Sequence, residues 1–210
     1  MKTRDRILES ARLLFNSYGY RNVSIRMISN DLKISPGNFN YHFRRKDEIL
    51  EILYFRMVDT FKARIEKNKN EQAHFKKLKH DLNEEMNIML DYKFIWTDLH
   101  HIRLQFKYID QHFRKTYPKR IKSYQFLFFI LQQKNLMQAK LNKYEDVQLA
   151  ECIISYSDTY IFNNPLESSN EINMLKQDYA EKSLLLFYPY LTQKGKHELN
   201  KELIWTEAIL

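Results

Sequence analysis

The residues with the most distinctive chemistry in this chain lie in a short polar stretch near its N-terminus, residues 35–46. Asn38 and Asn40 carry amide groups that can form paired hydrogen bonds with the N6 and N7 atoms of adenine. The side chains that follow can donate hydrogen bonds or positive charge to phosphates: Tyr41, His42, Arg44, Arg45 and Lys46. Together these residue types predict a surface that reads bases and contacts a phosphate backbone, although each asparagine alone is equally typical of an exposed or capping position.

Two short helices are expected to position these side chains. Ser24 is a suitable N-cap for the first, whose apolar residues fall on one face: Ile25, Ile28 and Leu32. Ser35 is a suitable N-cap for the second, and Pro36 occupies its first position, where a missing N–H costs no hydrogen bond. The second helix is therefore expected from Pro36 to Phe43. Phe39 and Phe43, four residues apart, would face inward, leaving the polar side chains between them for a partner.

Two further helices complete this N-terminal unit. Thr3 is expected to cap a helix that ends at Gly19, since glycine readily adopts the left-handed conformation found at helix ends. Its apolar residues recur at offsets of three and four: Ile7, Leu8, Ala11, Leu14, Phe15 and Tyr18. After the basic run, Asp47 and Glu48 favour the start of a long helix, because their negative charges complement the helix dipole.

The stretch from Ala11 to Leu50 resembles the DNA-binding region of the TetR family of bacterial transcriptional repressors. The resemblance extends over about residues 5–55 and is carried by a set of residues in matching register: Ala11, Phe15, Gly19, Ile25, Ile28, Ser35, Gly37, Tyr41, Phe43, Lys46 and Glu48. One position departs from the family, which usually has a tyrosine where this chain has Asn40. The family's operator contact at that position therefore does not transfer.

The resemblance implies a homodimer that binds double-stranded DNA, with the second helix of each copy in successive major grooves about 34–36 Å apart. The operator is then expected to be a near-palindrome, because it mirrors the two-fold symmetry of the dimer. Base contacts are expected from Asn38 and Asn40. Phosphate and other backbone contacts are expected from the surrounding residues: Ser24, Arg26, Ser35, Pro36, Gly37, Tyr41, His42 and Lys46.

Composition and charge agree with a DNA-binding, all-α protein. The chain has 210 residues with only three glycines and four prolines, which leaves few positions for hairpin turns. We therefore expect an N-terminal helix-turn-helix domain, residues 1–50, and a larger helical effector-binding and dimerisation domain, residues 51–210. The net charge is +8, and residues 1–50 contribute ten Lys and Arg against five acidic residues. Such an asymmetry is expected where the N-terminal part meets phosphates.

The single cysteine and the start of the chain indicate a cytoplasmic protein. One cysteine, Cys152, excludes an intramolecular disulfide and is expected to be a buried packing residue in a reducing compartment. The charged residues at the start of the chain are not followed by an apolar run, so no secretory signal is expected. The longest apolar runs are too short to span a membrane.

Beyond residue 70 the family resemblance fades, and periodicity predicts the elements. After a polar joint at Lys67–Gln72, helices are expected at Glu71–Asp91, Lys93–Gln105, Gln111–Gln138, Tyr144–Phe162, Glu171–Tyr190 and Gln193–Trp205. The centre of the third, Tyr124–Leu131, is apolar on nearly every side and is expected to be buried all round. The fourth and fifth are expected to form the dimer interface through apolar residues that one partner helix cannot cover: Ile153, Ile154, Ile161, Leu175, Leu184, Leu185 and Tyr188.

Motifs for catalysis or cofactor binding are missing from the sequence. It has no glycine-rich phosphate loop, no paired cysteines and no nucleophile elbow, so we expect neither an enzyme nor a cofactor. The one histidine pair, His100 and His101, is a poor metal chelate because adjacent helical residues point about 100° apart. We therefore expect no metal site.

The second part of the chain is rich in aromatic residues, which either fill its core or line a ligand cavity. In the TetR family this region holds the effector pocket, and the resemblance therefore implies a small apolar or aromatic effector that releases DNA. The candidate pocket residues are Trp96, His100, Tyr124, Phe128, Tyr156 and Tyr160. Two alternatives remain open: a regulator of the same fold that acts through a protein partner, and a carrier or enzyme with a basic helical N-terminus.

Overall fold

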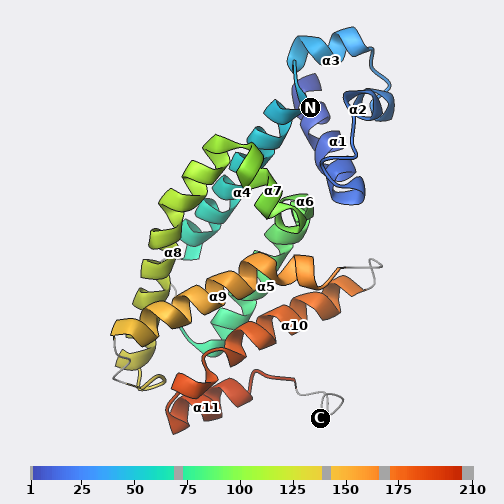
Figure 1. The fold of residues 1–210 in the computed structure, drawn as a ribbon. Helices are drawn as coiled ribbons and strands as arrows, with labels where there is room; N and C mark the ends of the chain where they lie inside the picture. The colour runs from blue at the N-terminus through green and yellow to red at the C-terminus, as the bar shows by residue number, and fades with distance from the viewer. Residues whose placement is uncertain (1, 69–72, 139–142, 166–170, 205–210) are drawn as a thin grey trace. The chain divides into compact units, whose positions relative to one another are not determined.

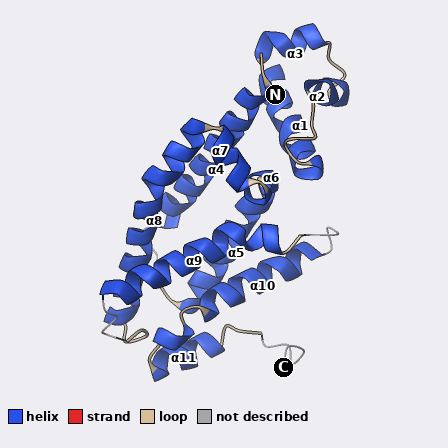
Figure 2. Ribbon diagram, in the orientation of Figure 1, coloured by secondary structure: helices blue, strands red, loops and turns tan. Residues whose placement is uncertain are grey.

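The computed structural model describes residues 2–68, 73–138, 143–165 and 171–204, and these residues form helices joined by short connections, without a strand (Figure 2). The all-α fold expected from the sequence is confirmed. The helices follow one another along the chain as α1 (Thr3–Tyr18), α2 (Ile25–Asp31), α3 (Pro36–His42), α4 (Lys46–Asn68), α5 (Phe75–Asp91), α6 (Lys93–Thr97), α7 (Leu99–Gln105), α8 (Lys107–Gln133), α9 (Lys143–Asn163), α10 (Ile172–Leu185), the 3₁₀ turn η2 (Tyr188–Tyr190) and α11 (Gln193–Asn200).

The chain divides into two compact units. Unit 1 consists of residues 1–69 and 88–111, and unit 2 consists of residues 70–87 and 112–210. The division falls inside two helices, so that α5 begins in unit 2 and ends in unit 1, whereas α8 begins in unit 1 and ends in unit 2. Each unit therefore contains segments that are far apart in sequence.

In unit 1, the first three helices group around the start of α4 (Figure 1). One apolar face of α1 is buried there, together with residues of α2, α3 and α4: Ile7, Leu8, Ala11, Phe15, Ile28, Phe39, Ile49 and Leu50. The Ser10 hydroxyl donates to Asp31 over 2.6 Å and links α1 to α2. A small three-helix core of this kind can hold α3 in place by burying its apolar side.

Unit 1 also contains the residues that follow the end of α5, and α1 is bonded to them. The Asn16 side chain donates to the Asp91 carbonyl over 2.9 Å and accepts from the Phe94 backbone N–H over 3.1 Å. Arg12 donates to the same Asp91 carbonyl over 2.6 Å. The rings of Phe15 and Phe94 meet edge to face with centroids 5.2 Å apart. The core of unit 1 is therefore completed by residues more than seventy positions along the chain.

The ends of α1 confirm one sequence expectation and correct another. Gly19 follows the helix with φ of +78°, a conformation that glycine adopts without steric cost, as expected. Thr3 is the first helical residue, however, and Lys2 occupies the N-cap position without a side-chain hydrogen bond. The expected threonine cap is wrong because the helix begins one residue too early for the Thr3 side chain to reach the free backbone N–H groups.

In unit 2, α9 and α10 lie side by side and run in opposite directions (Figure 1). Between them the Tyr160 hydroxyl donates to Asp178 over 2.5 Å, and the ring of Tyr160 lies 5.0 Å from that of Tyr179. Arg120 of α8 forms a bidentate ion pair with Asp158 of α9, at 2.9 and 2.6 Å. Residues from α5, α8, α9, α10 and α11 share one apolar core, which includes Phe75, Phe128, Leu131, Ile153, Leu184, Phe187 and Leu199.

The apolar centre of α8 is not buried all round. Phe128 and Leu131 are buried, but Phe126 is 64% exposed and Phe129 is 53% exposed. The sequence prediction for Tyr124–Leu131 is wrong because, among the described residues, neighbouring helices bury one side of α8 and leave the side with Phe126 and Phe129 exposed. Apolar composition shows that a helix tolerates burial, and it does not show how many partners are present.

Two expectations for α9 and α10 also need correction. Of the seven residues expected at a dimer seam, five are buried within the chain itself: Ile153, Ile154, Ile161, Leu175 and Leu184. The other two, Leu185 and Tyr188, are half-buried against the core of unit 2. Cys152, expected to be buried, is exposed. The buried positions of α9 include 149, 150, 153, 154 and 157, and residue 152 falls on the opposite face of that helix.

Most of the other expected helices are confirmed with shifted ends. The helix expected over Lys93–Gln105 is interrupted at Asp98 and forms α6 and α7, while α8 begins four residues earlier than expected, at Lys107. Of the expected polar joint, residues 67 and 68 belong to α4, and residues 69–72 lie outside the described part of the chain. Among the described residues, none of the helices has the length and apolar character needed to cross a bilayer.

Candidate functional site

The second helix of the helix-turn-helix, α3, is built as the sequence predicts. The Ser35 hydroxyl accepts the Asn38 backbone N–H over 3.1 Å, and Pro36 is the first helical residue. Phe39 and Phe43 are buried, as expected, and anchor the helix to unit 1. The helix ends at His42, one residue before the expected position.

The outer face of α3 is largely exposed to solvent. Tyr41 is 86% exposed, although large aromatic side chains are usually at least half buried. The residues beside it are also exposed: Ser35, Pro36, Gly37, Asn38 and Asn40, while His42 is half-buried with its ring 5.0 Å from that of Tyr41. The structure thus brings the sequence-predicted DNA contacts of α3 onto one accessible surface, next to the exposed Arg44 and Arg45.

The first helix of the motif, α2, places Ser24 and Arg26 at its exposed N-terminal end. The Ser24 hydroxyl oxygen accepts the Met27 backbone N–H over 3.2 Å, which confirms the predicted cap. This bond uses an oxygen lone pair, so the hydroxyl hydrogen can still donate to a phosphate. The turn between α2 and α3 contains Lys33 with φ of +53°, the left-handed conformation that reverses the chain there.

Lys46, the last expected phosphate contact, is bonded inside the protein. Its Nζ donates to the carbonyl oxygens of Tyr20 and Val23, each over 2.7 Å, and lies 4.2 Å from the centre of the Tyr20 ring. Partial burial lowers the pKa of the Lys46 ammonium. Burial raises the pKa of Tyr20, which also donates to Asp47 over 2.5 Å. Because Lys46 Nζ donates to the Tyr20 and Val23 carbonyl oxygens, two of its three N–H groups join α4 to the connection between α1 and α2.

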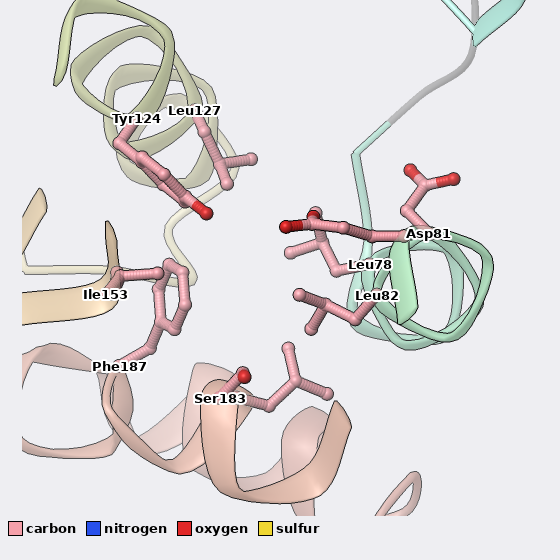
Figure 3. A pocket seen from close by; sticks show the side chains of 10 residues that line it. Leu78, Asp81, Leu82, Tyr124, Leu127, Ile153, Ser183 and Phe187 are labelled. Carbon is pink, nitrogen blue, oxygen red and sulfur yellow. The ribbon is translucent and has the colours of Figure 1, made fainter. Parts of the chain in front are cut away.

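Unit 2 contains a cavity of about 120 Å³ between α5, α8, α9 and α10 (Figure 3). Its walls are mostly apolar, with contributions from Leu78, Leu82, Leu127, Ile153, Leu184 and Phe187. An apolar cavity of about 150 Å³ is known to hold benzene, so this space suits a molecule of about that size.

Four polar residues interrupt the apolar wall: Asp81, Glu85, Tyr124 and Ser183. Asp81 forms an ion pair with Lys77, one turn earlier on α5. In Figure 3, Tyr124 extends from α8 and Ser183 from α10 toward the same space. The Ser183 side chain is 1% exposed, and its hydroxyl has no hydrogen-bond partner among the described residues.

Glu85 connects the cavity wall to a cluster of tyrosines on α9 and α10. Its Oε1 lies 3.0 Å from the Ser157 hydroxyl and 3.2 Å from the Tyr179 hydroxyl, and these two hydroxyls are 2.7 Å apart. Burial raises the pKa of Tyr179, and the Glu85 carboxylate adds to the effect. Burial likewise raises the pKa of Tyr156 to about 12. The hydroxyls of both tyrosines therefore remain neutral at physiological pH.

Of the six candidate pocket residues, Tyr124 lines the cavity. Phe128 packs in the core of unit 2 with its ring 5.8 Å from that of Phe187, while Tyr156 and Tyr160 belong to the tyrosine cluster. Trp96 and His100 belong to unit 1. Sequence reasoning missed Asp81, Glu85 and Ser183. The first two interrupt the apolar stripe of α5 at Leu78 and Leu82, and this polar interruption was an available signal.

The histidine pair has an ordinary surface setting. His100 and His101 are exposed, and His101 Nδ1 lies 2.8 Å from Asp98. Within the described ranges no cluster of His, Cys, Asp and Glu has the geometry of a metal site.

Family comparisons cover most of the chain. Residues 7–53 match the model for bacterial regulatory proteins of the tetR family, and residues 56–199 match a TetR model described as a bacterial transcriptional repressor. The first match spans α1, α2, α3 and the first part of α4.

Known proteins with similar sequence or structure are also transcriptional regulators. An HTH-type transcriptional regulator of Staphylococcus aureus strain USA300 is 32% identical to this chain over 94 residues. The matched part is 43% of this chain and 45% of that regulator, so the chain matches about half the length of that relative. A TetR-family regulator from Marinobacter aquaeolei VT8 superimposes with a TM-score of 0.84 at 22% identity, covering 96% of this chain and 97% of that one. A putative transcriptional regulator from Saccharomonospora viridis was solved in complex with choline. It superimposes with a TM-score of 0.64 at 18% sequence identity, and the match covers 90% of this chain and 98% of that chain.

Proposed function

The chain belongs to the TetR family of bacterial transcriptional regulators, and we propose that it is a cytoplasmic repressor that a small molecule releases from a near-palindromic operator. The observation that carries the proposal is the outer face of α3. Phe39 and Phe43, on the inner side of α3, are buried in unit 1. The polar side of the helix is exposed, and the Tyr41 side chain there is 86% exposed. An exposed tyrosine next to exposed asparagines and arginines suits DNA and has no role in the core.

We assign DNA binding to residues 1–50 and distinguish two kinds of contact. Asn38 and Asn40 are the base-reading residues, since each amide can pair with adenine in the major groove. The other contacts position the protein on the phosphate backbone: Ser24, Arg26, Ser35, Pro36, Gly37, Tyr41 and His42. Lys46 has one N–H group left for a phosphate and acts chiefly inside the protein.

We assign dimerisation and effector binding to residues 51–210. A homodimer would present two copies of α3 to successive major grooves, which accounts for the expected palindrome. The exposed apolar side chains of unit 2 offer surface for a second copy: Phe126, Phe129, Phe162 and Met174. The cavity of unit 2 supports an effector, and the choline complex of the S. viridis regulator is an example of a small molecule on this fold.

Substitutions on α3 will separate base contacts from phosphate contacts. Asn40→Ala is expected to reduce the preference for operator over random DNA by about 1–3 kcal/mol, since a good base contact contributes that much discrimination. Tyr41→Ala is expected to weaken binding to both DNAs by a similar factor, since a phosphate contact carries no sequence information. Fluorescence anisotropy at fixed salt, on an operator found by genomic binding-site mapping, measures both effects.

Asn173→Ala, an exposed change on α10, is the matched control and should leave both affinities unchanged. If the ratio of the affinities for operator and random DNA is unchanged in Asn40→Ala, the base-reading assignment is refuted. Failure of the unaltered protein to bind any duplex at low salt would refute the regulator proposal as a whole.

The effector is tested by a thermal-shift screen followed by a DNA-release assay. A ligand at a hundredfold excess over its dissociation constant is expected to stabilise the protein by about 2.7 kcal/mol, which for a chain of this size raises the melting temperature by roughly 5–11 °C. A true effector also dissociates the operator, because it binds the DNA-incompetent conformer more tightly. If stabilising ligands leave operator binding unchanged, a protein partner becomes the better account of regulation.

A further inference from the structure

One carboxylate in the wall of the unit 2 cavity, Glu85, forms no ion pair with a basic side chain of the described residues. Within the described part of the chain, no Lys or Arg nitrogen lies within ion-pair distance of Glu85. Arg120, whose positive charge interacts with Glu85 at longer range, is held by both oxygens of Asp158. A half-buried carboxylate is costly unless it is paired or fully hydrogen-bonded, so the environment of Glu85 favours an added positive charge.

The hydrogen bonds already made by Glu85 leave room for such a charge. The Ser157 and Tyr179 hydroxyls both approach Oε1, and each has a single hydrogen to donate. An ionised carboxylate has about four acceptor positions on its two oxygens. At most two are therefore filled by these hydroxyls. Asp81, the other carboxylate on the wall, is already paired with Lys77 and does not compete for the same ligand.

A second, independent feature of the same cavity wall also indicates a ligand: the buried hydroxyl group of Ser183. Ser183 lies on α10, is 1% exposed and lines the cavity, and its hydroxyl has no partner among the described residues. Figure 3 shows it facing the space into which Tyr124 also extends. Buried hydroxyl groups in proteins are normally hydrogen-bonded, so an unpartnered one in a cavity wall indicates a site for a polar ligand atom.

From these features we infer that the cavity binds a small primary ammonium ion with a compact apolar body. The ammonium group donates to the Glu85 carboxylate and to the Ser183 hydroxyl oxygen, while the body packs on the leucine and isoleucine walls. A primary ammonium has three N–H donors and matches both acceptors, whereas a neutral alcohol brings no charge to Glu85. The cavity volume of about 120 Å³ limits the ligand to about the size of benzene. This inference rests on the proposed function, in which the same cavity receives the effector.

Calorimetric titration of the full chain with cyclopentylammonium chloride and with cyclopentanol tests the inference, because the two probes share one body and differ in the charged group. At pH 7 we expect the ammonium to bind at least tenfold more tightly than the alcohol. Glu85→Gln keeps the size of the side chain and one oxygen that can accept from Ser157 and Tyr179, removes the negative charge, and should abolish that preference. Glu84→Gln, an exposed change one residue earlier, should preserve it.

Ser183→Ala provides a second test of the ammonium site, because Ser183 lies on α10 and Glu85 lies on α5. It should weaken ammonium binding several-fold, because one N–H group loses its acceptor, while the helical circular dichroism of the protein stays unchanged. A Ser183→Ala variant that binds the ammonium as tightly as the unaltered protein would remove Ser183 from the site and overturn the proposed two-acceptor geometry.

The outcomes separate this inference from the proposed function. Equal affinity for the two probes, no binding of the ammonium, or an unaltered preference in Glu85→Gln overturns the ammonium site. The effector proposal then stands if another compound stabilises the protein and releases DNA. Ammonium binding that depends on Glu85 but leaves operator binding intact supports the site and shows that this probe is not itself the releasing effector.

Discussion

Gly195→Ala is expected to destabilise unit 2 by about 3 kcal/mol or more, the largest effect anticipated for any single methyl group in this protein. Gly195 is buried in α11, where an added Cβ would lie 1.9 Å from the carbonyl oxygen of Leu136 and 2.8 Å from its carbon. Such distances require the backbone itself to move. The movement would also strain the bonds that hold α11, from the Thr192 N–H to the Leu136 carbonyl at 3.1 Å and from the Gly195 N–H to the Thr192 hydroxyl at 3.0 Å.

Urea unfolding followed by circular dichroism measures the effect, and Gly37→Ala is the matched control. Gly37 lies in α3, where an added Cβ meets nothing closer than 3.9 Å. Alanine is the better helix former there, so this variant should be as stable as the unaltered protein or up to about 1 kcal/mol more stable. Equal unfolding midpoints for Gly195→Ala and the unaltered protein would show that α11 does not sit against Leu136 as described.

Lys46→Ala is expected to reduce the stability of unit 1 by about 2–3 kcal/mol. A hydrogen bond to a charged group contributes about 1.5–3 kcal/mol, and the two bonds lost here share one half-buried ammonium, so their contributions do not add in full. The carbonyl groups of Tyr20 and Val23 would lose their charged donor. The ring of Tyr20 would also lose the ammonium that lies 4.2 Å from its centre. Thermal unfolding measures the loss.

Arg45→Ala separates this structural role from phosphate binding. Arg45 is an exposed neighbour with a 3.9 Å contact to Glu48, and surface ion pairs of that kind contribute at most about 1 kcal/mol. Its loss should leave the melting temperature nearly unchanged and weaken DNA binding. If Lys46→Ala instead melts normally and only DNA binding falls, Lys46 is a phosphate contact, as the sequence alone had suggested.

Local features of the helix-turn-helix were predictable because their causes lie within a few residues of one another. Ser24 caps α2 and Ser35 caps α3, and each helix starts at the next residue. Pro36 is the first residue of α3, a position that suits proline. Phe39 and Phe43 lie on one side of a helix by spacing alone. These interactions span four residues or fewer, so no knowledge of the tertiary structure was needed to infer them.

Features that depend on tertiary partners were missed or misjudged. Phe126 and Phe129 are apolar and were expected to be buried, yet both are exposed. Their burial depends on whether another helix packs on their side of α8, which the sequence does not show. Lys46 looked like a phosphate ligand because its partners, Tyr20 and Val23, lie more than twenty residues earlier and accept through backbone oxygens.

The cavity was harder still to predict, because each wall comes from a different helix. Glu85 and Ser183 are almost a hundred positions apart, and their approach to one space follows only from the packing of α5, α8, α9 and α10. A carboxylate within an apolar stripe was visible at Glu85. The sequence offered no comparable signal at Ser183, since one serine in an otherwise apolar helix face is ordinary.

The division of the chain inside α5 and α8 has a consequence for building chimeric regulators. A DNA-reading segment taken from a relative and cut at residue 50 or 69 would bring α1 without the Phe94 ring and the Asp91 carbonyl that complete its surroundings. Phe15, Asn16 and Arg12 would then meet foreign residues. An exchange of operator specificity between relatives therefore needs two transplanted segments, residues 1–69 together with residues 88–111, or substitutions restricted to the outer face of α3.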